Sequence, residues 1–116
     1  MTIEEKYHDL VKECEELDYS DTEAIFLYAN NELSKYSWEL ALVVMVNIFI
    51  KDPDIPMDEI SEHIILEIEY EGSKTTYNYI KQKYDESEDI RVKKNLDFLM
   101  GILENKYAHM KITLKK

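Results

Sequence analysis

Three aspartates in the sequence have a spacing that could bind a metal ion. Asp52, Asp54 and Asp58 lie near the ligand positions of a calcium-binding loop. Such a loop needs a glycine at its sixth position and a glutamate at its twelfth, where this chain has Met57 and His63. Both prolines of the chain also interrupt the segment. We therefore expect these aspartates to end one helix and begin the next, rather than to bind calcium.

A second candidate is His63, which lies four residues after Glu59 and four before Glu67. On a helix this spacing puts the three side chains one turn apart, where they could hold a metal ion. No second histidine or cysteine lies near them in the sequence, and paired surface charges produce the same spacing. The sequence therefore predicts neither a metal site nor a cofactor.

The single cysteine, Cys14, is a candidate nucleophile. A nucleophilic cysteine needs an electropositive environment, whereas Glu13, Glu15 and Glu16 would raise the pKa of this thiol. The chain has no glycine-rich phosphate loop, and no pair of carboxylates stands out as general acid and base. We expect Cys14 to be a small buried hydrophobe and the protein not to be an enzyme.

The composition describes the scaffold that positions these residues. A chain of 116 residues, 45% hydrophobic and 34% charged, forms one globular domain, and its two glycines and two prolines favour helices over hairpins. One cysteine rules out an internal disulfide and suits a reducing compartment. The acidic N-terminus is unlike a secretion signal. The longest apolar run, 38–50, gives a helix of about 20 Å, too short to span a membrane. We expect a cytoplasmic protein.

Helical spacing predicts an all-α domain over residues 1–116, a bundle of about six helices. Their ranges are 3–17, 21–35, 38–50, 56–70, 74–84 and 89–107. Capping boxes at Thr2–Glu5 and Ser20–Glu23 begin the first two, and Gly72 caps the end of the fourth. The run 38–50 is expected to be the buried central helix, in which Asn47 needs a hydrogen-bond partner. The tail, 108–116, alternates like a strand, so it is either an extended arm or disordered.

The same spacing predicts which side of each helix is buried. The first helix is expected to bury Ile3, Tyr7, Leu10, Cys14 and Leu17, and the second Ile25, Tyr28, Ala29, Leu33 and Tyr36. In the fourth helix, Pro56 is placed in the first turn. Its buried stripe comprises Met57, Ile60, Ile64 and Ile68.

Charge is distributed unevenly along the chain. Residues 1–72 carry 19 acids and four lysines, a net charge of −15, whereas residues 73–116 carry a net charge of +4. The acidic part would repel nucleic acid and anionic membranes and would attract a basic partner. Solubility alone is the other explanation of such a surface.

The outer side of the fourth helix is the candidate site for that partner. Glu59, Glu62 and Glu69 lie around Leu66 there, and an apolar anchor ringed by acids suits the capture of a basic protein. The alternative is that the helix packs on two sides and Leu66 belongs to the core. The predicted partner-binding residues are Asp52, Asp54, Asp58, Glu59, Glu62, His63, Leu66, Glu69 and Tyr70.

Residues 31–70 resemble the bacterial immunity proteins of the MafI type. The matching segments are Glu39-Leu40-Ala41-Leu42 and the acidic corner Asp54-Ile55-Pro56-Met57. Where that family has a Gly-Trp step, this chain has Ser37-Trp38-Glu39, and residues 73–116 have no counterpart. The resemblance implies a helical protein that neutralises a co-encoded toxin, often a ribonuclease, as a heterodimer. Carboxylates would stand in for phosphates in the toxin's basic cleft.

Two other functions fit the same sequence. One is a viral or phage-encoded all-α blocker of a host protein, a Bcl-2-like module with a groove for an amphipathic helix. The other is an acidic nucleic-acid mimic or regulatory subunit.

Overall fold

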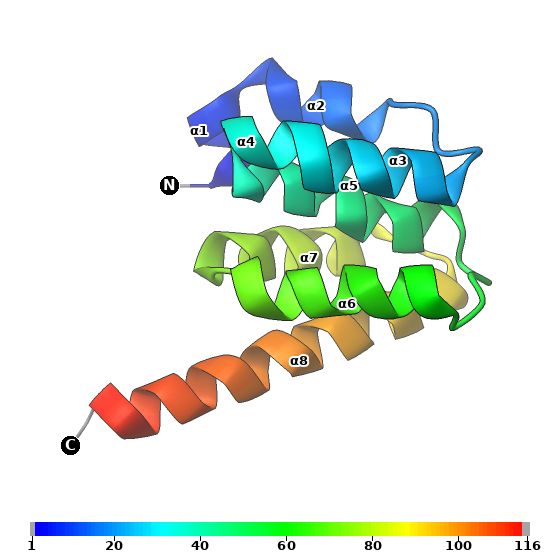
Figure 1. Cartoon of the computed structure of the whole chain (residues 1–116). Coiled ribbons are helices and arrows are strands. Elements are labelled where there is room, and N and C mark those ends of the chain that lie inside the picture. Colours follow the sequence, from blue (N-terminus) through cyan, green and yellow to red (C-terminus); the bar gives the residue numbers. More distant parts are fainter. Residues whose placement is uncertain (1, 115–116) are drawn as a thin grey trace.

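The computed structural model describes the backbone of residues 2–114 and the side chains of residues 2–108. This part of the chain is all-α, as predicted, and folds into the bundle shown in Figure 1. Its elements are α1 (Ile3–Tyr7), α2 (Asp9–Glu15), α3 (Thr22–Tyr28), the π-helix η1 (Ala29–Leu33), α4 (Ser34–Tyr36), α5 (Trp38–Lys51), α6 (Glu59–Glu71), α7 (Lys74–Glu86) and α8 (Ile90–Leu114).

The helix α5 lies at the centre of the bundle, between the layer of α2, α3 and α4 and the layer of α6, α7 and α8 (Figure 1). Residues 40–49 are all buried, which confirms the predicted central helix. Each buried aliphatic or aromatic side chain contributes about 1.5–3 kcal/mol relative to exposure. The helix begins where the Leu40 N–H donates to Oγ of Ser37 at 3.3 Å. It is therefore the element on which the others pack.

The one polar residue inside α5, Asn47, is buried and has the partner that the sequence requires. Its Nδ2 donates to the Val43 carbonyl and to Oη of Tyr79, both at 2.8 Å. Tyr79 in turn donates to Glu15, which forms an ion pair with Lys83 at 2.8 Å. Burial raises the pKa of the Tyr79 hydroxyl far above its ordinary value. This chain of polar contacts joins α2, α5 and α7.

The predicted helix over 3–17 is interrupted at His8. Thr2 and Glu5 form the predicted capping box, but His8 has φ 53° and ψ −121°, in the left-handed region that side chains avoid. The interruption changes which side of α2 is buried. Val11 faces the core, whereas Leu10, predicted to be buried, is 37% exposed. A helix of uniform period was therefore the wrong prediction here.

Residues 22–36 form one helical rod that contains the π-helix η1. Its N-cap is Asp21 rather than Ser20, since the Ala24 N–H donates to Oδ1 of Asp21 at 3.1 Å. The rod packs through Ile25, Phe26 and Ala29, so Tyr28 and Tyr36 remain on the surface, contrary to the prediction. The π-helix makes i→i+5 bonds and alters the register of the residues that follow it.

The helix α6 begins at Glu59, three residues later than predicted, so Pro56 lies outside it. Asp58 is the N-cap: the Ser61 N–H donates to its Oδ1 at 3.0 Å, and its own N–H donates to Oγ of Ser61 at 2.8 Å. This capping box outweighs the preference of proline for a first turn. Ile64 and Ile68 are buried as predicted, whereas Met57 is 60% exposed.

The other end of α6 is closed by Gly72 and by α8. Gly72 caps the helix as predicted, but with φ −62° rather than a left-handed conformation. The Lys106 ammonium donates to the carbonyls of Glu69, Tyr70 and Gly72 at 2.7–3.0 Å. A cation at this position satisfies carbonyls that have no partner within the helix.

The last helix, α8, is longer than predicted. It continues to Leu114 and extends past α6 and α7 (Figure 1), so residues 108–114 are helical rather than extended or disordered. Residues 115–116 lie outside the described residues. Val92, Leu96, Leu99 and Leu103, which recur at helical spacing, are buried.

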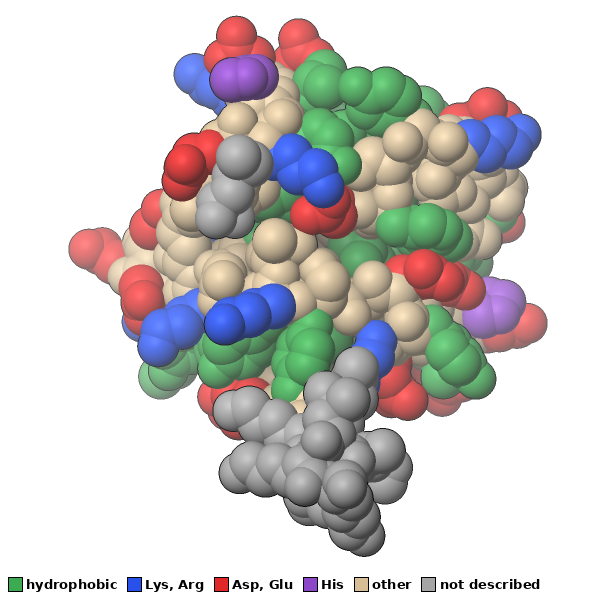
Figure 2. All heavy atoms as spheres, turned by 90° about the vertical axis from the view of Figure 1, so that its left-hand side faces the viewer, with side chains coloured by type: hydrophobic (Ala, Val, Ile, Leu, Met, Phe, Trp, Pro, Cys, Tyr) green, Lys and Arg blue, Asp and Glu red, His purple; other side chains and the backbone are tan. Residues whose placement is uncertain are grey.

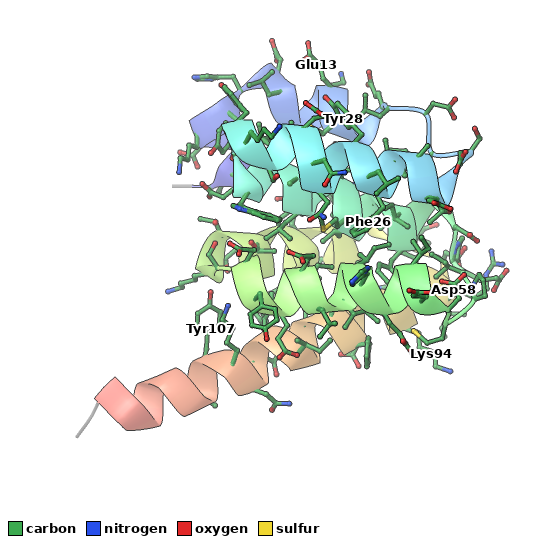
Figure 3. The ribbon with its side chains drawn as sticks, in the orientation of Figure 1. Glu13, Phe26, Tyr28, Asp58, Lys94 and Tyr107 are labelled. Atoms are coloured by element: carbon green, nitrogen blue, oxygen red, sulfur yellow. The ribbon has the colours of Figure 1, made fainter. Side chains whose placement is uncertain are left out.

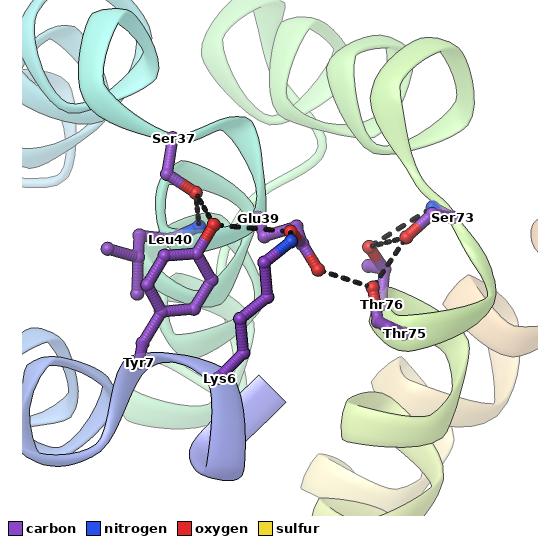
Figure 4. Close-up of polar contacts among 8 residues, drawn as sticks. All are labelled: Lys6, Tyr7, Ser37, Glu39, Leu40, Ser73, Thr75 and Thr76. Carbon is purple, nitrogen blue, oxygen red and sulfur yellow. Dashed lines mark hydrogen bonds and ion pairs between the residues drawn. The ribbon is translucent and has the colours of Figure 1, made fainter. Parts of the chain in front are cut away.

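A polar network ties α1, α5 and α7 together at one end of the bundle (Figure 4). The Lys6 ammonium contacts Oε1 of Glu39 at 2.5 Å, and Thr75 donates to Oε2 at 2.8 Å. Tyr7 donates to Glu39 and accepts from Ser37. Burial alone would raise the pKa of Glu39, but the hydrogen bonds from Lys6 and Thr75 outweigh it and hold the pKa below 4.5. Glu39 is therefore ionised at neutral pH.

Because its folded pKa is lowered, Glu39 stabilises the protein above pH 4.5, and this contribution is lost as the pH falls through the folded pKa. We expect Glu39→Gln to lower the free energy of unfolding by about 1–2 kcal/mol at pH 7, because a charged acceptor is lost. The difference from the wild type should shrink as the pH falls through the folded pKa of Glu39, which lies below its ordinary value. Denaturant unfolding of both proteins across this range measures it, and a gap independent of pH would contradict the assignment.

Candidate functional site

The outer side of α6 carries six of the nine predicted partner-binding residues. Glu59, Glu62, Leu66 and Glu69 follow one another at intervals of three, four and three, which aligns them along one line of the helix. His63 and Tyr70 lie on the adjacent line. We call these six residues the α6 face. All of them are exposed, so the structure brings together what the sequence grouped.

Leu66 answers the question that the sequence left open. It is 46% exposed, so it is an apolar side chain on the surface and not part of the core. Tyr70, one turn further along, is 74% exposed. The face therefore presents two large apolar groups among glutamates.

The acids of α6 have no counter-ion in the described part of the chain. The helix contains five glutamates and no lysine or arginine. None of these glutamates forms an ion pair with a described residue. Elsewhere, acids such as Glu15 and Glu39 are paired with lysines. The α6 face is thus a local concentration of negative charge without an ion pair to a described residue, since the nearby Lys106 ammonium binds main-chain carbonyls instead.

The N-terminal end of α6 adds a further negative charge. The Ser61 N–H bound to Asp58 holds the pKa of that carboxyl below its ordinary value. Beside it, the ring of His63 stacks on Phe26 of α3, with centroids 6.1 Å apart. Figure 3 shows Asp58 at the start of α6 and Phe26 between α3 and α6. His63 therefore connects the α6 face to α3 at this end.

Asp52 and Asp58 lie in a polar hollow beside that end. The hollow has a volume of about 410 Å³, and Asp21 and Glu23 from the start of α3 also line it. Sequence reasoning treated Asp21 and Glu23 only as capping residues. They lie about 30 residues from Asp52 in the chain, and no local pattern indicates that the fold brings them to it. The hollow extends the negative surface from α6 to α3.

Asp54 is the predicted residue that the structure sets apart from the others. Its carboxylate binds the Arg91 guanidinium of α8 at 2.6 Å, and Arg91 also binds Asp89 at 2.9 Å. Both partners of the Asp54 pair are more than half exposed, so the pair contributes little stability. Because Arg91 is shared between Asp54 and Asp89, Asp54 adds less negative charge to the surface than an acid without an ion pair.

Besides the acidic surface, the sequence raised two other possibilities, a metal site and a nucleophilic cysteine. Within the described side chains, no three His, Cys, Asp or Glu residues are arranged to hold a metal ion. Cys14 is buried, and burial raises the pKa of its thiol to about 11, with Glu13 and Glu15 adding to the effect. At neutral pH this cysteine is therefore a thiol. The α6 face offers negative charge around two exposed apolar side chains, Leu66 and Tyr70.

No family model, curated protein or solved structure matches this chain. Over the part of the chain that the structure describes, no helix combines the length and the apolar character needed to cross a membrane.

Proposed function

We propose that this protein is an immunity-type inhibitor that binds a basic protein toxin, a nuclease, in the cytoplasm. The complex is a heterodimer in which the α6 face occupies the toxin's nucleic-acid-binding cleft. The observation that carries the proposal is the group of uncompensated glutamates around Leu66 and Tyr70. The resemblance of residues 31–70 to MafI-type immunity proteins supports it independently.

The inhibition is steric and electrostatic. A nuclease cleft is lined by lysines and arginines that bind phosphates, and carboxylates can take the positions of those phosphates. Glu59, Glu62 and Glu69 span about 15 Å along the helix axis, since each residue advances 1.5 Å. Charge complementarity accelerates association, whereas burial of Leu66 and Tyr70 slows dissociation.

The experiment that tests the proposal is co-expression with the protein encoded by the adjacent gene. We expect a basic protein to co-purify at low salt, to lose affinity as salt increases, and to be inactive as a nuclease while bound. Absence of any basic partner at low salt would contradict the proposal. If the purified complex keeps its nuclease activity, the binding proposal stands and only the inhibitory role is contradicted.

A further inference from the structure

A second surface, remote from the α6 face, has a different character. A groove of about 430 Å³ lies between α2 and the rod 22–36. Its apolar lining comprises Leu10, Cys14, Leu17, Tyr28, Leu33, Tyr36 and the buried Leu40 of α5. Figure 2 shows hydrophobic side chains gathered at the top of the molecule, the side on which α2 and the rod lie in Figure 1. We call this surface the apolar groove.

The groove is open to solvent. Tyr36 is 69% exposed, Tyr28 44% and Leu10 37%, although the sequence pattern places all three in the core. The η1 π-helix forms part of the groove wall, and π-helical turns occur frequently at functional sites. Exposed tyrosines beside an apolar floor are typical of protein-binding surfaces. The groove therefore has the properties of a protein-binding surface.

The walls of the groove determine what kind of chain can enter it. Both walls are helices, whose backbone groups are bonded internally, so the groove offers side-chain contacts only. An extended peptide would leave its own N–H and C=O groups unpaired against this apolar lining. A helix satisfies its own backbone. Leu10 and Cys14 lie one turn apart on α2, about 6 Å along its axis, which matches anchors at i and i+4 of an entering helix.

The charges around the groove indicate which residues should lie beside the apolar side of a bound helix. Glu13 lines it, and Figure 3 shows Glu13 and Tyr28 on the same side of the molecule. Asp9, Glu16 and Glu32 are also exposed on these elements, against two lysines. None of these four acids forms an ion pair with a described residue, whereas Glu15 is paired with Lys83. Lysine or arginine beside the apolar anchors would complement these acids.

We propose that the apolar groove binds one amphipathic helix of a partner protein, with large apolar residues along one side and lysines or arginines flanking them. A second copy of this chain fits less well, because the acidic α2 rims of the two copies would face each other. The proposal does not rest on the α6 face.

The test uses a fluorescein-labelled 16-residue helical peptide with leucines at i, i+4 and i+7 and lysines beside them. We expect saturable binding to the full chain by anisotropy, with a Kd below about 0.1 mM at low salt. Leu10→Ala with Tyr36→Ala should weaken it by about tenfold or more. Both side chains are partly exposed, so the fold should persist, and thermal unfolding verifies this.

Three controls separate the possible outcomes. Leu66→Ala with Tyr70→Ala removes the apolar side chains of the α6 face without changing the net charge and should leave peptide binding intact, so the two surfaces are tested independently. A peptide with the leucines distributed around the helix, and one with glutamate in place of lysine, should both bind at least about tenfold more weakly. The proposal is overturned if the first peptide does not bind, if the groove variant or the redistributed peptide binds equally well, or if sedimentation shows a dimer that Tyr36→Ala dissociates.

Discussion

Lysine in place of Glu59, Glu62 and Glu69 should slow association with the basic partner by about 100-fold at low salt. The change replaces three negative charges on one line of α6 by three positive charges, opposite the cationic cleft of the partner that we propose. Electrostatic steering accounts for about 10- to 1,000-fold in association rate, and reversal of the charge converts attraction into repulsion. The dissociation rate should change less, because Leu66 and Tyr70 remain in place.

The measurement is the association rate constant by stopped-flow fluorescence at low and high salt. A matched control is lysine in place of Asp85, Glu88 and Asp97, three exposed acids outside α6 that form no ion pair with a described residue. Both variants have the same net charge, so net charge alone predicts the same slowing in each. Equal effects would place the binding surface elsewhere. Denaturant unfolding should show each variant within about 1 kcal/mol of the wild type.

Gly72→Ala should lower the free energy of unfolding by about 2 kcal/mol, the typical cost of overpacking a closed site. A Cβ at this position would overlap the Ile68 carbonyl oxygen and would lie 2.7 Å from Cδ2 of Leu103. The carbonyl belongs to the last turn of α6 and accepts from the Gly72 N–H, so it cannot move aside without loss of the cap. Gly72 is required for close packing of α6 on α8.

Gly101 provides the same substitution with the opposite expected result. It lies inside α8, and a Cβ there would meet nothing within 4 Å. Gly101→Ala should therefore raise the free energy of unfolding by about 0.5–1 kcal/mol, because alanine restricts the unfolded chain. Chemical denaturation of the Gly72→Ala and Gly101→Ala variants measures both changes in the free energy of unfolding. Destabilisation by both would show that α8 does not tolerate any side chain at position 101.

The sequence was most informative where one local signal dominated. The apolar run after Ser37 predicted α5 to within one residue of its end, and the Thr2–Glu5 capping box was correct. Three of the five glutamates of α6, Glu59, Glu62 and Glu69, lie on one side as predicted, because buried Ile64 and Ile68 define another side. In each case the pattern lies within a single helix and needs no knowledge of its neighbours.

The predictions that failed depended on interactions between distant segments. The break at His8 and the π-helix cannot be inferred from apolar spacing, so Leu10, Tyr28 and Tyr36 were assigned to the core. The pairing of Asp54 with Arg91 joins residues 37 apart in the chain. The polar hollow beside α6 and the apolar groove also combine segments far apart in sequence, so they form only when the bundle is packed.

The composition of α6 limits how its face could be reused in protein engineering. Glu67 and Glu71 lie one turn apart, and five glutamates without a cation destabilise an isolated helix by mutual repulsion. A 13-residue helix is already marginal in water. In the intact protein, burial of Ile68 and the Lys106 ammonium at the last carbonyls keep this segment helical. A synthetic peptide of the α6 sequence would be unstructured at neutral pH, so a minimal protein that presents the α6 face has to retain α5 and α8 as its support.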